Sequence, residues 1–216
     1  MVREALFGTT YLGGDIDGPS LREAVAELRR HGRVLLDGQD PRAAHFPSDP
    51  AGEDPRLGFS GWIRDRARLE QLAHRTPSDI QVRRLDWPTF QQCLWREHLL
   101  RVFGSVEGYL RNSLGFCMAS KDEVLAEAHA FFWGDREVEI GTITGEQHRG
   151  AGHATTACAA LVLACQARDH RTYWGCDIGN PASVAIARKL GYPEEHGYRL
   201  IRFEATADPS PLRQQR

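Results

Sequence analysis

The chain has 216 residues, of which 41% are hydrophobic and 26% charged, as in an ordinary globular protein with one domain of moderate size. Its net charge of −2 and pI of about 6.5 give no electrostatic support for a nucleic-acid partner or an anionic membrane surface. No apolar run approaches the roughly 20 residues of a membrane span, and the first residues lack the apolar core of a signal peptide. These features predict a cytoplasmic protein without a membrane partner.

The first 79 residues are predicted to form an accessory region with few regular elements. Ser20 is suited to cap a helix over 21–31, because apolar residues follow it at helical spacing. The segment RVLLDG at 33–38 predicts a short strand. Proline, glycine and charged residues dominate 38–60, which predicts a long loop, and a second amphipathic helix is expected over 62–74.

More regular patterns begin after Pro77. A strand is expected at 80–85, and Asp86 followed by Pro88 is typical of a helix start, here leading into 90–103. Ser105 is expected to begin a further short helix. Compact polar turns separate three strand-like segments, which predicts an antiparallel meander over 114–119, 124–132 and 136–144.

The C-terminal third alternates helix and strand patterns. They predict a helix over 152–168, a strand at 172–178, a helix over 181–190 that ends at Gly191, and a strand at 198–203. The predicted fold class is therefore α/β, with a mixed, mostly antiparallel sheet flanked by helices in a domain over 80–206. Residues 207–216 are expected to be a disordered tail.

The five cysteines show no metal-binding pattern. They are odd in number and none forms a C-x-x-C pair, so we expect free thiols and no metal site. Cys158 and Cys165 are seven residues apart, which places them on the same face of the predicted helix. Both are expected to fill the core.

The stretch TGEQHRGAGHATTA at 144–157 places two glycines, Gly150 and Gly152, between a strand and a helix. Small residues at a helix N-terminus let a ligand approach the free backbone N–H groups, where the helix dipole favours negative charge. The stretch therefore predicts a phosphate or pyrophosphate site. It matches neither the Walker loop nor G-x-G-x-x-G. The alternative is a strand-to-helix turn that needs glycine for geometry alone.

Two motifs in this region resemble those of the GNAT (GCN5-related N-acetyltransferase) superfamily. QHRGAG at 147–152 fits the pattern Q/R-x-x-G-x-G/A, and NPASVAIARKLGY at 180–192 is similar to the downstream motif of the same superfamily. The resemblance covers about residues 80–203. Further segments, including GFC at 115–117, resemble a bacterial branch that contains zwittermicin-resistance-type acetyltransferases.

The resemblance implies a GNAT fold and acetyl-CoA as cosubstrate. The loop backbone would hold the pyrophosphate through His148, Arg149, Gly150, Ala151, Gly152 and His153. The end of the preceding strand would pair with the pantetheine arm through Thr142, Ile143 and Thr144. Asn180 would bond a pantetheine amide, and Ser183 would lie near the thioester. The chain departs from the family at Ala187, where many members carry the tyrosine that protonates the leaving thiolate, so the general acid is unassigned.

Amine acetylation needs a group that removes a proton, and two strand carboxylates are candidates. Glu137 and Glu139 are two residues apart, so they share a strand face, and the resemblance places a base at the position of Glu139. The alternative for both is a solvated or ion-paired carboxylate, favoured for Glu137. Cys176 and Asp177 are weaker candidates.

Several other side chains have two open interpretations. His148 contacts phosphate or faces solvent. Arg149 and Arg168 meet the 3′-phosphate of coenzyme A or lie on plain surface. The aromatic residues Trp87, Trp95, Tyr109 and Trp133 are expected in the core or on the surface rather than at a substrate.

The sequence thus predicts an acetyl-CoA-dependent N-acetyltransferase that acts on a small-molecule amine, such as an antibiotic or a biosynthetic intermediate. The protein would be a monomer or a homodimer. Two alternatives stay open. One is a protein or peptide N-acetyltransferase, and the other is a non-catalytic module that binds acyl-CoA.

Overall fold

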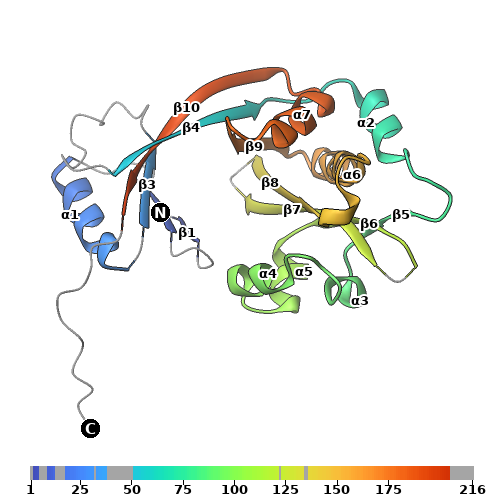
Figure 1. The fold of residues 1–216 in the computed structure, drawn as a ribbon, viewed down its shortest axis with the longest axis horizontal. Coiled ribbons are helices and arrows are strands. Elements are labelled where there is room, and N and C mark those ends of the chain that lie inside the picture. The colour runs from blue at the N-terminus through green and yellow to red at the C-terminus, as the bar shows by residue number, and fades with distance from the viewer. Residues whose placement is uncertain are drawn as a thin grey trace, which may run out of the picture. The chain divides into compact units, whose positions relative to one another are not determined.

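A computed structural model describes residues 2–4, 9–12, 18–31, 33–37, 51–121, 123–133 and 136–204. The chain forms two compact units (Figure 1): one of residues 1–56 with 197–216, and one of residues 57–196. Two long strands, β4 (Gly52–Ser60) and β10 (Glu194–Phe203), carry the chain from one unit into the other and back.

The first unit contains strands β1 (Val2–Glu4), β2 (Thr9–Leu12) and β3 (Arg33–Asp37), helix α1 (Gly18–Leu28) and a 3-10 turn at Arg29–His31. The parallel pair β2–β3 lies between two antiparallel pairs, β1–β2 and β3–β10. Leu21 and Val25, one turn apart on α1, are buried against Ile201 and Phe203 of β10. The expected strand at 33–38 and helix near 21–31 are confirmed, whereas the expected tail at 207–216 lies outside the described residues.

The second unit holds most of the described elements. In chain order they are α2 (Arg66–Ala73), β5 (Gln81–Arg84), α3 (Trp87–Phe90), α4 (Arg96–Phe103), α5 (Val106–Asn112), β6 (Gly115–Ala119), β7 (Val124–Trp133), β8 (Glu137–Thr144), a 3-10 turn at Glu146–His148, α6 (His153–Gln166), β9 (Arg171–Asp177) and α7 (Pro181–Leu190). Its strands follow the order β10-β4-β9-β8-β7-β6-β5. Strands β5 to β8 are antiparallel neighbours, and β8 and β9 are parallel. The predicted meander and mixed sheet are confirmed.

Helices cover both faces of this sheet (Figure 1). One core lies beneath α6, which buries most of its residues, and α2 and α7 pack beside that helix. The other core lies beneath α3, α4 and α5, around Phe90, Leu99 and Tyr109. Strand β8 follows the period of two that separates the faces: Val138 and Ile140 are buried in the α6 core, whereas Glu137 and Glu139 are half-buried.

The border between the compact units differs from the predicted border at residue 80. Residues 57–79 belong to the second unit because Phe59, Ile63 and Leu69 are buried in its core. The predicted loop over 38–60 is wrong for its last nine residues, which form β4. Pro55 and two glycines hid that strand in the sequence, and residues 38–50 lie outside the described part.

Helix caps agree well with the sequence, but one predicted helix is broken. Asp86 Oδ1 accepts the Thr89 N–H at 2.9 Å and Ser105 Oγ accepts the Gly108 N–H at 3.0 Å, as expected for N-caps. The predicted helix over 90–103 is wrong, because α3 ends at Phe90 and α4 begins at Arg96. The turn between them is held by Glu127 of β7, which is distant in sequence.

All five cysteines are free, as expected, and all five are buried. Cys158 and Cys165 lie in the α6 core, and burial raises the pKa of each thiol to about 12. Since the thiolate is the reactive form, these thiols are chemically quiet near neutral pH. Their role is packing.

Candidate functional site

A cavity of about 590 Å³ opens where β8 ends, within the second unit. Its lining comes from the end of β8, from the loop and first turn of α6, and from α7. The lining residues are Thr142, Ile143, Thr144, His148, Arg149, Gly150, Gly152, His153, Ala154, Thr155, Asn180, Ala182, Ser183, Ala185, Ile186 and Lys189. The structure thus brings together every sequence-predicted cofactor-binding residue except Ala151, whose side chain is exposed beside them.

The cavity starts where two parallel strands separate. Paired positions of β8 and β9 run from Glu137–Arg171 to Glu139–Tyr173. Beyond them, Thr142 to Thr144 line the cavity together with residues of α7. A strand edge without a neighbouring strand offers backbone N–H and C=O groups to an extended ligand.

The glycines of the loop have the geometry that a close backbone approach needs. Gly150 and Gly152 have φ values of +82° and +89°, in the left-handed region that favours glycine. A Cβ on either residue would meet no atom within 4 Å, so open space lies in front of both. Gly152 caps α6 without any side-chain hydrogen bond. The first-turn N–H groups therefore face the cavity as anion donors.

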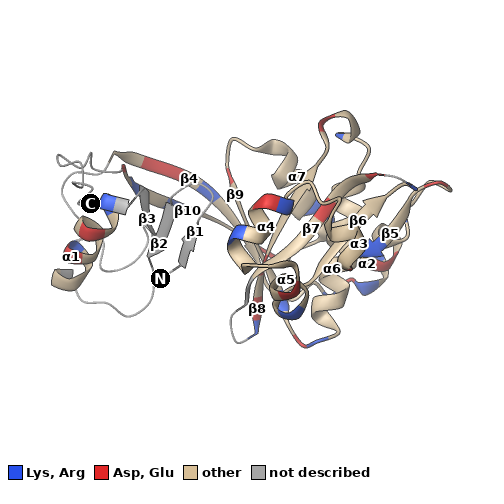
Figure 2. Cartoon of the chain, turned by 90° about the horizontal axis from the view of Figure 1, so that it is seen from below, with Lys and Arg blue, Asp and Glu red and all other residues tan. Residues whose placement is uncertain are grey.

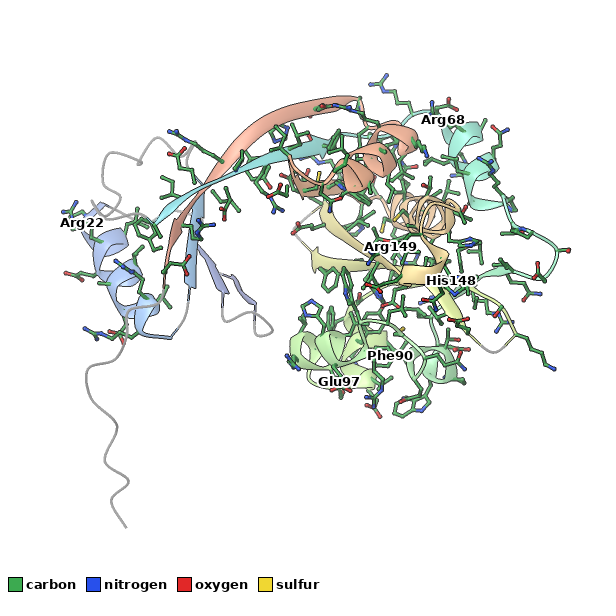
Figure 3. The ribbon with its side chains drawn as sticks, viewed as in Figure 1. Arg22, Arg68, Phe90, Glu97, His148 and Arg149 are labelled. Atoms are coloured by element: carbon green, nitrogen blue, oxygen red, sulfur yellow. The ribbon has the colours of Figure 1, made fainter. Side chains whose placement is uncertain are left out.

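A carboxylate from a neighbouring turn anchors this loop. Glu123, just before β7, accepts a hydrogen bond from Gln147 Nε2 at 3.0 Å, and its Oε1 lies 3.1 Å from His148 Nε2. Figure 3 shows His148 and Arg149 together at the start of α6. The His148 ring lies against Glu123 and also lines the cavity, so its contact with phosphate stays a prediction.

Positive charge at the cavity comes from two side chains. Arg149 is exposed, with Nη2 3.8 Å from Glu146 Oε1, and Lys189 lines the cavity from α7. Arg168 lies elsewhere, because its Nη1 donates to the Ala164 carbonyl at 2.8 Å and the residue does not line the cavity. Burial, and then the charge of His148, lower the pKa of His153, so His153 adds little positive charge near neutral pH.

The start of α7 is ordered by the residues that the sequence singled out. Asn180 Oδ1 caps the helix by accepting the Ser183 N–H at 3.1 Å, which leaves the Asn180 amide nitrogen free to donate. Ser183 Oγ accepts the Trp174 indole N–H at 3.1 Å. Ala187 is fully buried in the core. A tyrosine-sized group therefore has no space at Ala187 without repacking.

The predicted acid–base candidates on β8 and β9 have different surroundings. Glu137 forms an ion pair with Arg171 at 2.9 Å, which favours the structural interpretation. Asp177 Oδ1 accepts the Gly179 N–H at 2.6 Å in the turn before α7, and Cys176 is buried. Glu139 is half-buried opposite Tyr173, at the last paired position before the strands separate. Of these candidates, Glu139 lies on β8 three residues before the first cavity-lining residue of that strand, Thr142, and does not itself line the cavity.

Sequence reasoning missed part of the cavity. It did not single out Lys189, although Ala182, Ala185, Ile186 and Lys189 follow Asn180 at helical spacing and so share a face with Ser183. That periodicity was the available signal. No sequence pattern pointed to Glu123, because its contacts with Gln147 and His148 form only when the chain folds.

The anchoring role of Glu123 predicts a selective effect on coenzyme A. Replacing Glu123 by alanine removes both loop contacts, and we expect the Kd for coenzyme A to rise about three- to tenfold, the worth of one or two hydrogen bonds. Calorimetry measures this. Glu123→Gln keeps an accepting oxygen and should bind nearly as the wild type. Glu146→Ala removes a nearby exposed acid as a control for charge, and tighter binding in both alanine variants would contradict the anchoring role.

Comparison with known proteins gives the family. The model of the GNAT acetyltransferase family matches residues 54–201. The chain therefore belongs to the GNAT acetyltransferase family, and the resemblance noted in the sequence is confirmed. The matched segment begins within β4, so the family domain includes residues 54–79 that the sequence had assigned to the accessory region.

One curated relative is the uncharacterized N-acetyltransferase YdfB of Bacillus subtilis (strain 168). It is 30% identical over 158 residues, which are 70% of this chain and 58% of the relative. The chain thus spans less than two thirds of that relative's length. The finer likeness to zwittermicin-resistance enzymes stays a prediction.

Solved structures share the fold. A GCN5-related N-acetyltransferase-like protein from Streptococcus suis 89/1591 superposes with a TM-score of 0.67 at 22% identity, over 89% of this chain and 78% of its own. A GCN5-related N-acetyltransferase from Kribbella flavida gives a TM-score of 0.54 at 16% identity, over 90% of this chain and 77% of its own. At these identities the likeness concerns the fold alone.

Proposed function

We propose that the chain is an N-acetyltransferase that transfers the acetyl group of acetyl-CoA directly to a small-molecule amine. The observation that carries this proposal is the cavity at the end of β8, where a glycine loop opens into space beside residues of β8 that lie beyond the described pairs with β9. Family membership supports the same activity.

The residues present fit coenzyme A. Two glycines leave room for a phosphate against the first-turn N–H groups of α6, and Arg149 and Lys189 add cations. The edge at Thr142 to Thr144 would pair with the pantetheine amides, and Asn180 has an amide N–H to donate to a pantetheine carbonyl. These contacts would direct the thioester toward Glu139.

In the proposed reaction the amine nitrogen attacks the thioester carbon, a C–N bond forms and the C–S bond breaks. Glu139 would take the proton from the amine, and coenzyme A would leave as the thiolate and gain a proton. Because the neutral amine is the nucleophile, a carboxylate next to the thioester serves both to attract the protonated amine and to deprotonate it. Glu137 has a separate ion-pair partner, so it does not share this role.

The remaining parts of the proposal concern setting and partners. Acidic and basic residues are mixed over the helices and strands of the second unit (Figure 2), which gives no reason to expect nucleic acid or an anionic membrane. Among the described residues no helix is long and apolar enough to cross a membrane. Five buried free thiols support a reducing, cytoplasmic location. A monomer or a homodimer is compatible with these features.

The proposal predicts turnover of small amines. With acetyl-CoA, we expect small amines, including aminoacyl and polyamino compounds, to be acetylated with a higher kcat/KM than peptides with a free α-amine. A thiol-release assay with mass analysis of the product measures this. A preference for peptides above about tenfold, or 1.4 kcal/mol, would favour peptide acetylation instead. Binding of acetyl-CoA without turnover on any amine would favour the non-catalytic module.

A further inference from the structure

Aromatic rings cover the sheet face on which Glu139 lies. Gly141, two residues after Glu139 and so on the same face, is packed closely: a Cβ there would lie 2.4 Å from Phe131 Cε2 and 3.2 Å from Trp95 Cζ3. The Trp95 and Phe131 ring centroids are 5.8 Å apart. Residue 141 thus has no side chain, and two aromatic rings occupy that space.

His98 completes a cluster of three rings. Its centroid lies 5.8 Å from that of Trp95 and 5.5 Å from that of Phe131. All three side chains are only half-buried, so each keeps a surface that a ligand can contact. His98 Nδ1 is itself buried and has no hydrogen-bond partner in the described part of the chain. Burial lowers the pKa of His98, and the nearby His129 and Arg101 charges lower it further, so the ring is neutral near pH 7.

A fully buried carboxylate holds this cluster in place. Glu127 on β7 accepts the Leu94 N–H and the Trp95 N–H, each at 2.8 Å, and so holds the backbone immediately before α4 against the sheet. Trp95 is the N-cap of α4 and has no capping bond of its own. A carboxylate at a helix N-terminus also meets the positive end of the helix dipole. Glu127 therefore fixes the residue whose indole covers Gly141.

His129 contacts Glu127, and Tyr109 contacts His129 in turn. His129 Nε2 lies 3.1 Å from Glu127 Oε1, at an angle that makes an electrostatic contact rather than a hydrogen bond. The other ring nitrogen of His129 lies 2.8 Å from the Tyr109 hydroxyl. Tyr109 is buried between Phe90 and Phe103. The side chains of Tyr109, His129 and Glu127 are all buried, so they hold one another in place.

We propose that Trp95, His98 and Phe131 form the acceptor subsite, which takes an amine carried on an aromatic ring, and that Glu127 is the positioning residue of this subsite. The inference rests on the proposed acetyl transfer, because it places the amine beside Glu139. Partly exposed rings bind an aryl group by offset or edge contacts and a protonated amine over the ring face. The aromatic cluster supplies both contacts on the face that carries the candidate base.

Binding to the coenzyme A complex tests this assignment without requiring turnover. Calorimetry with 2-phenylethylamine and hexylamine, two primary amines that differ in their ring, compares affinities at saturating coenzyme A. We expect the aryl amine to bind at least about fivefold more tightly, the worth of one aromatic or cation–π contact. Trp95→Leu should remove this preference, and Trp95→Phe should restore part of it. Trp87→Leu, which changes an exposed tryptophan on neighbouring α3, should leave it unchanged.

A second variant tests the positioning role. Glu127→Gln sets an NH₂ group against one of the two backbone donors, so Trp95 loses its fixed place. We expect the KM for the aryl amine to rise while the Kd for coenzyme A, measured on the folded variant, stays unchanged. A general structural defect would move both values.

The outcomes separate this inference from the proposed function. Equal affinity for the two amines, or a preference that survives Trp95→Leu, overturns the acceptor subsite even if the protein acetylates amines. A Trp95-dependent preference for the aryl amine without any acetyl transfer upholds the subsite and overturns the enzymatic proposal. Absence of binding by either amine overturns the subsite as well.

Discussion

Replacing Glu139 by glutamine is expected to lower kcat by roughly 10²-fold or more, the usual effect of losing a general base. Glutamine keeps the size and polarity of the side chain but cannot take the proton of the amine. The residue lies on β8 at the last pair before the strands separate and does not line the cavity, so coenzyme A binding should be nearly intact. Steady-state kinetics between about pH 6 and 9, together with calorimetry of coenzyme A, measure both effects.

Glu137 provides the matched control for this variant. It lies two residues earlier on the same strand face, and its carboxylate pairs with Arg171 at 2.9 Å. Because both partners of this ion pair are about half exposed, its loss should change stability by less than about 1 kcal/mol. Glu137→Gln should therefore turn over nearly as fast as the wild type. Full activity of Glu139→Gln across the pH range would mean that water or another group takes the proton.

Elements whose determinants are local in sequence could be predicted. The N-caps at Asp86 and Ser105 each lie three residues before the N–H that they bind, so the pattern is visible in a short window. Gly191 ends α7 with φ of +88°, as its position after a helical run indicates. The meander followed from three strand patterns separated by polar turns. The loop at Gly150 and Gly152 could be predicted because both glycines lie in one short segment between a strand pattern and a helix pattern.

Features that depend on distant contacts could not be predicted. The break between α3 and α4 is set by Glu127, more than 30 residues away, so the helical pattern of 90–103 looked continuous. Strand β4 exists because its last residues reach the core of the second unit, whereas its own sequence contains Pro55 and glycines. The border between the two units lies before residue 57 rather than at residue 80, because residues in 57–79 are buried in the core of the second unit.

The candidate site divides along the same line. Its phosphate loop and strand edge lie within 142–153 and its helix cap lies at 180–183, and the resemblance of these segments to GNAT motifs named the residues that would hold the cosubstrate. The proposed acceptor side is assembled from α4, β7 and β8, and no motif links Trp95, Phe131 and Gly141. From the sequence, Trp95 was expected in the core or on the surface rather than at a substrate. Only the fold places its ring over β8, the strand that carries Glu139.

Replacing Gly152 by valine is expected to weaken coenzyme A binding at least about tenfold, or 1.4 kcal/mol, with the fold retained. Gly152 has φ of +89°, which a β-branched residue rarely adopts, so the loop backbone must shift or carry strain. The valine side chain would also project into the open space in front of the loop, where the phosphate must approach. Gly150→Val should act in the same way. Calorimetry on the folded variants measures the change.

Gly104 separates backbone strain from loss of the site. It ends α4 with φ of +77°, and a Cβ there would also meet no atom within 4 Å, but it does not line the cavity. Gly104→Val should therefore lower the melting temperature without changing the Kd for coenzyme A. If Gly152→Val lowers the melting temperature as much as Gly104→Val but leaves the Kd unchanged, the loop is a strand-to-helix turn and the cosubstrate binds elsewhere. A selective loss of affinity at Gly150 and Gly152 places the phosphate groups against the first turn of α6.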